Sequence, residues 1–164
     1  MPVCFTSLLL RAVPYGHPDV TAMVEEVQDE YRRRYGGDGD TAPVDPSQFA
    51  APHGWFVLGY ADGQPVAMGG WRTLGPEVKA PGERPAEIKR MYVRPAARGR
   101  GLSRLVLTAL EDSARAAGRD WLVLETGYAQ PEALGLYHSS GYIDVPDFGY
   151  YAGEPGAFHL GKRL

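Results

Sequence analysis

AEIKRMYVRPAARGRGLSRLVLTAL, residues 86–110, places a strand-like run before a turn rich in glycine and arginine, and a leucine-rich segment follows. Apolar residues recur at helical spacing after this turn, which predicts an amphipathic helix over 102–117. The first residues of such a helix carry unpaired amides and about half a positive charge. Gly99 and Gly101 have no Cβ, so the backbone can come close to a bound anion. The stretch therefore predicts an anion site, with an ordinary basic surface turn as the alternative.

The segments around this stretch show an alternation of strand and helix signals. The segment DWLVLETG is typical of a strand buried on both faces, and PEALGLYHSS begins with proline, as many helices do. Asp62-Gly63 joins two β-rich runs and favours a hairpin. We expect strands at 6–13, in the hairpin 55–72, and at 86–93, 120–127, 142–145 and 157–164, with helices between His17 and Gly36 and at 102–117 and 131–140, and one helical turn at 45–50. This order predicts a single α/β domain over residues 1–164, with a right-handed parallel crossover over 86–127.

The composition indicates a soluble globular protein. Of the 164 residues, 44% are apolar and 23% are charged, and the net charge is -3, so any anion site must be local and nucleic acid is not an expected partner. The longest apolar runs are LLL and WLVL, so no membrane association is expected. We interpret the N-terminus as a first strand and not as a signal peptide. Cys4 is the only cysteine, which excludes an intrachain disulfide and favours a structural role and a cytoplasmic location.

Several common catalytic and cofactor motifs are absent. The dinucleotide pattern G-x-G-x-x-G fails because Arg104 occupies its third glycine position, and the P-loop pattern does not occur. The four histidines are too dispersed to predict a metal site, and no G-x-S-x-G or Cys–His arrangement suggests covalent catalysis.

The order of these segments resembles the GCN5-related N-acetyltransferase (GNAT) family. The resemblance is close over residues 86–145, from EIKRMYV through R-G-R-G-L-S to LYHSSGY, and looser over the whole chain. The family signature Q/R-x-x-G-x-G/A matches Arg98 to Ser103, with serine in place of the final glycine or alanine. The resemblance implies an α/β (α+β) fold with a mixed central sheet of six to seven strands, flanked by helices and splayed between the fourth and fifth strands. It also implies acetyl-CoA as the cosubstrate and no metal.

The resemblance further implies how acetyl-CoA would be held. Amides from Arg98 to Arg104 would surround the pyrophosphate, and the pantetheine arm would pair with the strand around Met91 to Val93. An amide near Tyr92 would stabilise the oxyanion. The family often places an asparagine after the next strand, and here Gln130 is the nearest substitute. The implied cofactor-binding residues are Met91, Tyr92, Val93, Arg98, Gly99, Arg100, Gly101, Leu102, Ser103, Arg104, Gln130 and Tyr137.

Two residues are candidates for the proton transfers of acetyl transfer. Tyr137 lies where family members often carry a tyrosine near the cofactor sulfur, so it is the candidate acid, with a core-packing role as the alternative. Glu87 is the candidate base, but on a regular strand it shares a face with Lys89, and a nearby ammonium lowers the pKa of a carboxyl. A bulge in the strand would separate the two, and otherwise an ion pair is expected. Ordered water or His53 could replace Glu87.

The resemblance places the acceptor pocket among segments rich in aromatic residues. The candidate acceptor-binding residues are Tyr31, Arg34, Tyr35, His53 and Trp71, with Phe49, Tyr150 and Tyr151 in the same segments. Arg34 could hold a carboxylate or pair with Glu30 four residues before it. The acidic net charge and short connections favour a small-molecule acceptor over a protein.

These observations predict an acetyltransferase that moves the acetyl group to a primary amine of a small molecule by direct transfer in a ternary complex. A non-catalytic acyl-CoA-binding or sensing domain, or an acetyltransferase of protein amines, is the alternative. A nucleic-acid module using Arg94, Arg98, Arg100 and Arg104 lacks the basic, aromatic platform that such modules have. Family habit alone suggests a homodimer.

Overall fold

The computed structural model describes residues 7–164. Cys4 and the first residue of the expected first strand lie outside this range, so the interpretations placed on them have no structural counterpart here. Within residues 7–164, no helix has the combination of length and apolar character that a bilayer-spanning segment needs.

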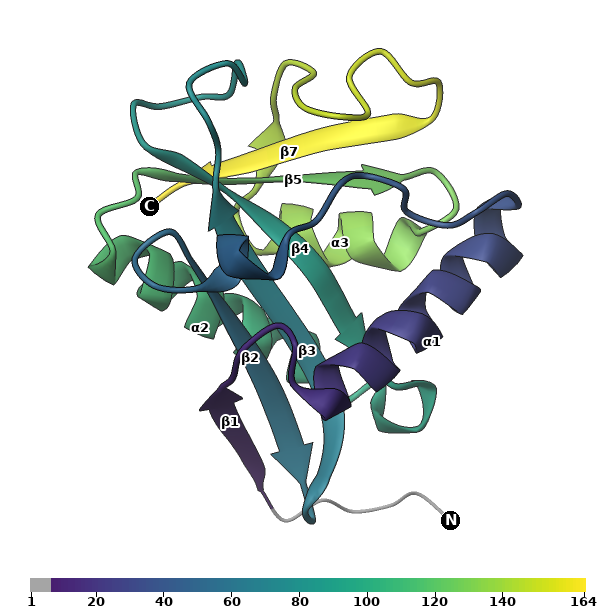
Figure 1. Ribbon diagram of the computed structural model, residues 1–164. Coiled ribbons are helices and arrows are strands. Elements are labelled where there is room, and N and C mark those ends of the chain that lie inside the picture. The colour runs from purple at the N-terminus through teal and green to yellow at the C-terminus, as the bar shows by residue number, and fades with distance from the viewer. Residues whose placement is uncertain (1–6) are drawn as a thin grey trace.

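A seven-stranded mixed sheet forms the centre of the structure, with the strand order β1-β2-β3-β4-β5-β7-β6 (Figure 1). The strands are β1 (Leu8–Ala12), β2 (Gly54–Ala61), β3 (Gln64–Thr73), β4 (Pro85–Val93), β5 (Trp121–Gly127), β6 (Ile143–Asp144) and β7 (Ala157–Arg163). The helices are α1 (Pro18–Tyr35), α2 (Leu102–Ala116) and α3 (Pro131–Ser139), with short 3₁₀ turns η1 (Pro46–Phe49) and η2 (Pro95–Ala97). The expected mixed sheet flanked by helices is confirmed, and β4 and β5 are its parallel pair.

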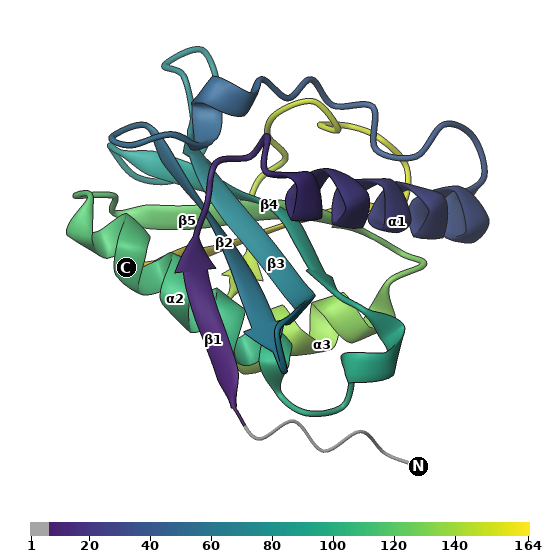
Figure 2. The same ribbon diagram turned by 60° about the horizontal axis from the view of Figure 1, so that its bottom comes forward.

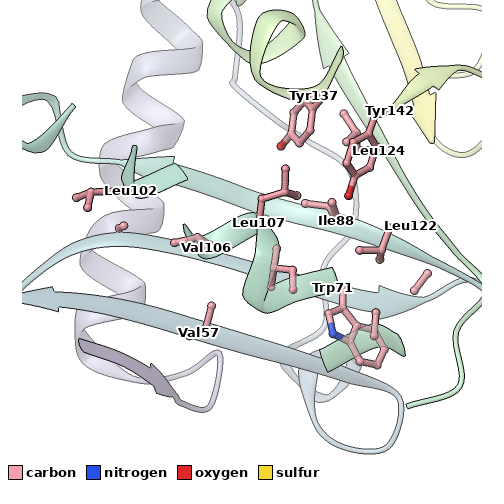
Figure 3. Packing of buried hydrophobic residues seen from close by; sticks show 14 of the residues in the cluster. Val57, Trp71, Ile88, Leu102, Val106, Leu107, Leu122, Leu124, Tyr137 and Tyr142 are labelled. Carbon is pink, nitrogen blue, oxygen red and sulfur yellow. The ribbon is translucent and has the colours of Figure 1, made fainter. Parts of the chain in front are cut away.

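Helices cover both faces of the sheet (Figure 2). On one face α1 packs its buried residues Val20, Met23 and Val27 against side chains of β2, β3 and β4. On the other face α2 and α3 cover a larger cluster that includes Trp71, Val106, Leu107 and Tyr137 (Figure 3). Because alternate residues of a strand point to opposite faces, Val57 joins the α2 cluster while Phe56 and Leu58 join the α1 cluster.

The sheet splays between β4 and β5. The two strands pair only at Pro85–Trp121, Ala86–Leu122 and Glu87–Val123. Beyond this point β5 stays paired with β7 through Gly127, whereas β4 follows β3 away from it (Figure 1). Within residues 7–164, the β5-facing edge of β4 therefore has no strand partner from Ile88 onward.

A β-bulge in β4 changes which side chains face this gap. Between the pairs Gly70–Lys89 and Met68–Tyr92, β4 contains one residue more than β3, and Arg90 has a positive φ of 61°. Ile88 and Met91 both pack on the α2 side, although they are three residues apart. As a result, Lys89 and Arg90 both reach Asp40 in the loop after α1, on the opposite side of the sheet.

Candidate functional site

A cavity of about 610 Å³ occupies the gap between β4 and β5. Its walls come from α1, β4, the start of α2, β5, α3 and the loop before β7. The volume lies in the range of sites that hold a cofactor or a small ligand. Strand splaying therefore produces a site that crosses the sheet from the N-terminus of α2 to the point where β4 and β5 separate.

The turn before α2, residues 98–104 (hereafter the glycine turn), forms one end of the cavity. Gly99 and Gly101 have φ values of 76° and 75°, and a Cβ built on either would meet no atom within 4 Å. Gly101 is the N-cap, no side chain of the described residues caps the helix, and the first turn contains no acidic residue. The amides of Leu102, Ser103 and Arg104 donate to no acceptor in the described part of the chain. Unpaired amides and the helix dipole together favour an anion here.

The structure limits which parts of the glycine turn are available to a ligand. The amide of Arg98 donates to Pro95 O at 3.2 Å, so it is already paired. The Arg98 side chain donates to Val93 O at 2.8 Å and pairs with Glu30 at 2.8 Å, which fixes the turn against β4 and α1. Arg104 donates to Ser139 and Ser140 at the end of α3.

Ten of the twelve residues expected at the cofactor line the cavity: Met91, Tyr92, Val93, Arg98, Gly99, Gly101, Leu102, Ser103, Gln130 and Tyr137. The side chains of Arg100 and Arg104 are outside the lining. Gln130 is the N-cap residue of α3 and accepts a hydrogen bond from Tyr35 at 3.0 Å.

Tyr137 projects from α3 toward the sheet, next to Tyr142 (Figure 3). It is 5% exposed, and its hydroxyl has no hydrogen-bond partner among the described residues. Burial, followed by the nearby Tyr31 hydroxyl, raises the pKa of Tyr137 well above its ordinary value of 10.0, so the phenol stays protonated at neutral pH. Tyr137 thus packs in the core and also lines the cavity with an available proton donor.

Glu87 lies where β4 and β5 begin to separate, and it is buried with two cations. Arg72 lies 3.5 Å and Lys89 3.8 Å from its carboxylate oxygens. The bulge of β4 comes at Arg90, after Lys89, so it does not separate Glu87 from Lys89. The ion-pair interpretation is therefore seen in the structure, and Glu87 also lines the cavity.

The Asp40 carboxylate contacts three side chains at the same end of the cavity. Lys89 Nζ donates to it at 2.9 Å, Arg90 pairs with the same oxygen, and the Tyr151 hydroxyl donates to the other oxygen at 2.6 Å. Burial opposes ionisation of this carboxyl, but Lys89 and Arg90 hold the pKa of Asp40 well below its usual value. The Tyr151 hydroxyl also accepts the amide of Thr41 at 3.0 Å. The loop after α1 and the loop before β7 are thereby joined over the cavity.

Glu125 on β5 is the third acidic side chain at this end. Its Oε1 accepts from His159 Nε2 at 3.2 Å and from the Tyr151 amide at 3.3 Å. Burial, followed by the negative charge of Glu87, raises the pKa of Glu125. Sequence reasoning missed both Asp40 and Glu125. For Glu125 a signal existed, because a carboxylate within the apolar strand WLVLETG needs a buried partner. Asp40 lies in a polar loop with no periodicity to single it out.

Only two of the five expected acceptor-binding residues line the cavity. Tyr31 and Tyr35 line the cavity, and burial with the nearby Asp40 charge raises the pKa of Tyr31 to about 12. The other three lie outside the lining. Arg34 donates to Ala129 O at 2.8 Å and lies 3.7 Å from Glu30 and in contact with Glu132, so its paired interpretation is the one observed.

His53 is exposed near the start of β2, and Trp71 is 1% exposed in the α2 cluster, where its Nε1 donates to Ser113 at 3.0 Å. Of the other aromatic residues, Tyr151 lines the cavity, and Phe49 is buried against α1. Tyr150 lines a smaller neighbouring hollow of about 170 Å³, which Glu87 also borders.

Comparison with known proteins agrees with this architecture. The family model described as the Acetyltransferase (GNAT) family matches residues 21–142. An IAA acetyltransferase from Azospirillum brasilense is 44% identical over 78 residues, which are 48% of this chain and 51% of that protein. The chain thus aligns with about half the length of this curated relative.

Solved structures share the fold over nearly the whole chain. A candidate acyl-CoA N-acyltransferase from Klebsiella pneumoniae superposes with a TM-score of 0.76 at 25% identity, over 96% of this chain and 97% of that one. A chain of the NatC complex, solved with Gag peptide and CoA, gives a TM-score of 0.70 at 17% identity, over 97% of this chain and 99% of that one. The family match covers well over half of the chain and includes β4, the glycine turn, β5 and α3, so the protein belongs to the GNAT acetyltransferase family.

Proposed function

We propose that the protein transfers the acetyl group of acetyl-CoA to a primary amine of a small-molecule acceptor, by direct attack in a ternary complex within a single domain. One observation carries the proposal. A single cavity is lined by the glycine turn near one end of β4 and by Asp40, Glu87 and Glu125 near the other. In such a cavity a donor held at the glycine turn and an acceptor held at the carboxylates would meet at the splay.

The donor would bind mainly through backbone groups. The amides from Leu102 to Arg104 would take the diphosphate, and the β5-facing edge of β4 beyond Glu87 would pair with the amides of the pantetheine arm. The bound CoA in the structurally similar NatC complex supports this assignment. No metal is needed for the step.

Acetyl transfer at this site needs two proton movements. The neutral amine attacks the thioester carbon, a C–N bond forms and the C–S bond breaks, and Tyr137 gives its proton to the departing sulfur. An amide of β4 near Tyr92 would stabilise the oxyanion that forms during the attack. The ammonium form of the acceptor must first lose a proton to a base at the other end of the cavity. Glu87 is the base expected from the sequence, and Glu125 is its neighbour across the splay.

The acceptor end of the cavity favours a small, positively charged molecule. Three carboxylates, Asp40, Glu87 and Glu125, outnumber the two cations Lys89 and Arg90 among the lining residues of this end. The hydrogen bonds of Tyr151 to Asp40 and Thr41 join two loops over this end. A long peptide would have to separate these loops. We therefore favour a small molecule over the protein amine suggested by the peptide in the NatC complex.

Calorimetry with acetyl-CoA, followed by an assay of CoA release with a panel of amines and peptides, tests the proposal. We expect binding, and turnover of small primary amines in preference to peptides. Ser103→Glu puts a negative charge in the first turn of α2 and should weaken acetyl-CoA binding at least about tenfold, which corresponds to about 1.4 kcal/mol. Thr108→Glu, an exposed position in the middle of the same helix, is the matched control and should bind normally.

Tight acetyl-CoA binding with no turnover of any amine would favour the sensing domain. Equal effects of the two substitutions on binding would contradict the assignment of the glycine turn.

A further inference from the structure

We propose that Glu125 is the catalytic residue that takes the proton from the acceptor ammonium, with His159 and Asp147 as the residues that position its carboxylate. The inference rests on the proposed acetyl transfer to an amine and identifies its base. It replaces Glu87, the base expected from the sequence, by a residue on the opposite wall of the splay.

Glu125 is placed where the acceptor must approach. Glu87 pairs with Val123 across β4 and β5, and Glu125 follows Val123 by two residues. Side chains of paired residues and of alternate residues share a face, so Glu87 and Glu125 face the same side at the point where the strands separate. The Glu125 side chain is 8% exposed and lines the cavity.

The contacts of the two glutamates give them different roles. Glu87 lies within 4 Å of both Arg72 and Lys89, so each of its two carboxylate oxygens already has a cation beside it. Glu125 has no Lys or Arg at ion-pair distance among the described residues; its ion-pair partner is His159. Its Oε1 accepts two hydrogen bonds, whereas its Oε2 accepts none from the described residues and is available for a proton.

The charged surroundings of Glu125 point in the same direction. Burial and Glu87 raise the pKa of Glu125, while the Tyr151 amide, His159 and Lys89 lower it in part. A carboxyl with a raised pKa binds a proton more readily near neutral pH.

A buried imidazole connects this carboxylate to the surface. The His159 side chain is 1% exposed and lies between Glu125 and Asp147, whose Oδ1 is 3.1 Å from His159 Nδ1. The Asp147 side chain is 55% exposed. Phe148 packs edge-on against the His159 imidazole, with the two ring centroids 5.1 Å apart. The ring contact with Phe148 holds His159 in place, its Nε2 lies 3.2 Å from Glu125 Oε1, and its Nδ1 lies at ion-pair distance from Asp147 but makes no hydrogen bond in the described part of the chain.

The proposed step conserves protons. The N–H bond of the ammonium breaks as an O–H bond forms on Glu125, and the amine lone pair then attacks the acetyl carbon. Tyr137 supplies the proton of the CoA thiol. The nitrogen is positively charged after the attack and loses a second proton as the amide forms and the C–S bond breaks, and this proton restores the Tyr137 phenol. Glu125 releases its proton to solvent, so the enzyme returns to its starting state.

The test is the pH dependence of kcat/KM in matched variants. Wild-type kcat/KM should fall on the acidic side with an apparent pKa above the ordinary glutamate value of 4.5. Glu125→Gln should lower kcat/KM at least about 100-fold and remove this acidic limb, because the general base is lost. Glu87→Gln, the same substitution across the splay, should keep the limb. His159→Gln retains an N–H donor but removes the imidazole, and it should shift the limb to higher pH because the coulombic interaction with His159 lowers the pKa of Glu125.

Two further measurements separate this inference from the proposed function. Acetyl-CoA binding by calorimetry should be equal in the wild type and Glu125→Gln, so loss of activity reports the base and not the cosubstrate. If the wild type binds acetyl-CoA but acetylates no amine, the proposed function fails. In that case the pKa of the Glu125 carboxyl can be measured directly, by NMR titration of wild-type protein labelled with ¹³C-glutamate. The same titration replaces the activity test if the Glu125→Gln variant does not fold. A Glu125 pKa at or below 4.5, or an acidic limb that survives in Glu125→Gln, would overturn the inference.

Discussion

Asp40→Asn should destabilise the protein strongly, because it removes the carboxylate that two buried cations share and leaves Lys89 only its longer contact with Glu87. Lys89 and Arg90 have side chains 8% and 5% exposed, and the Asp40 side chain is 14% exposed. Removing one partner of a buried ion pair costs about 3–5 kcal/mol, and the cavity admits some water here, so we expect about 3 kcal/mol. Asparagine can still accept the hydrogen bond from the Tyr151 hydroxyl, so the loss of stability reports the removal of the negative charge alone.

Equilibrium unfolding in urea, followed by tryptophan fluorescence at pH 7, measures this loss. The matched control is Asp29→Asn, because Asp29 pairs with Arg32 on the exposed face of α1, with side chains 59% and 48% exposed. Exposed pairs contribute about 0–1 kcal/mol, so the control should unfold almost as the wild type does. If Asp40→Asn lost no more than Asp29→Asn, the described charge cluster would not stabilise the fold.

The pH dependence gives the same prediction a second check. The folded-state pKa of Asp40 is depressed below its unfolded value of 3.8, so its contribution is present above pH 3.8 and is lost as the pH falls below it. The stability difference between wild type and Asp40→Asn should therefore be constant near neutral pH and shrink below 3.8. A difference that grew on acidification would have the wrong sign.

Three other substitutions test separate parts of the site. Tyr137→Phe should lower kcat about 100-fold or more with acetyl-CoA binding unchanged, measured by CoA release and calorimetry; unchanged kcat would remove Tyr137 as the acid. Gly101→Ala forces a Cβ onto a residue with φ of 75° and should cost about 1–2 kcal/mol in urea unfolding and weaken acetyl-CoA binding, whereas Gly16→Ala, with no positive φ and open space around it, should do neither. Tyr151→Phe removes the hydroxyl that joins the two loops and should raise KM for the amine while KM for acetyl-CoA stays constant; equal changes in both would contradict its placement at the acceptor end.

The parts of the fold that could be predicted are those whose signals lie within a short stretch of sequence. The α2 stripe, the turn at Asp62-Gly63 and the apolar strand expected at 120–127 each carry their own periodicity or turn residues, and all three elements are observed, the strand as Trp121–Gly127 with its first half buried. The glycine turn was found for the same reason, since its glycines and its helix are contiguous.

The missed features depend on contacts between distant segments. The bulge at Arg90 arises from pairing with β3, where Met91 packs over Gly69: a Cβ on Gly69 would lie 2.7 Å from Met91 Sδ. This bulge directs Arg90 toward Asp40, which is 50 residues away in sequence. The cross-strand pair of Glu125 and His159 likewise depends on the register of β5 and β7. No single window of sequence contains either arrangement.

The central claim is that backbone amides at the start of α2 bind the diphosphate of acetyl-CoA. A titration of ¹⁵N-labelled protein with acetyl-CoA, followed by NMR of each backbone amide, tests it most directly. The amides of Leu102, Ser103 and Arg104 should show large, saturable shifts that S-acetylpantetheine, which lacks the diphosphate, does not reproduce. Saturable binding that left these three amides unshifted, or equal shifts with S-acetylpantetheine, would contradict the claim.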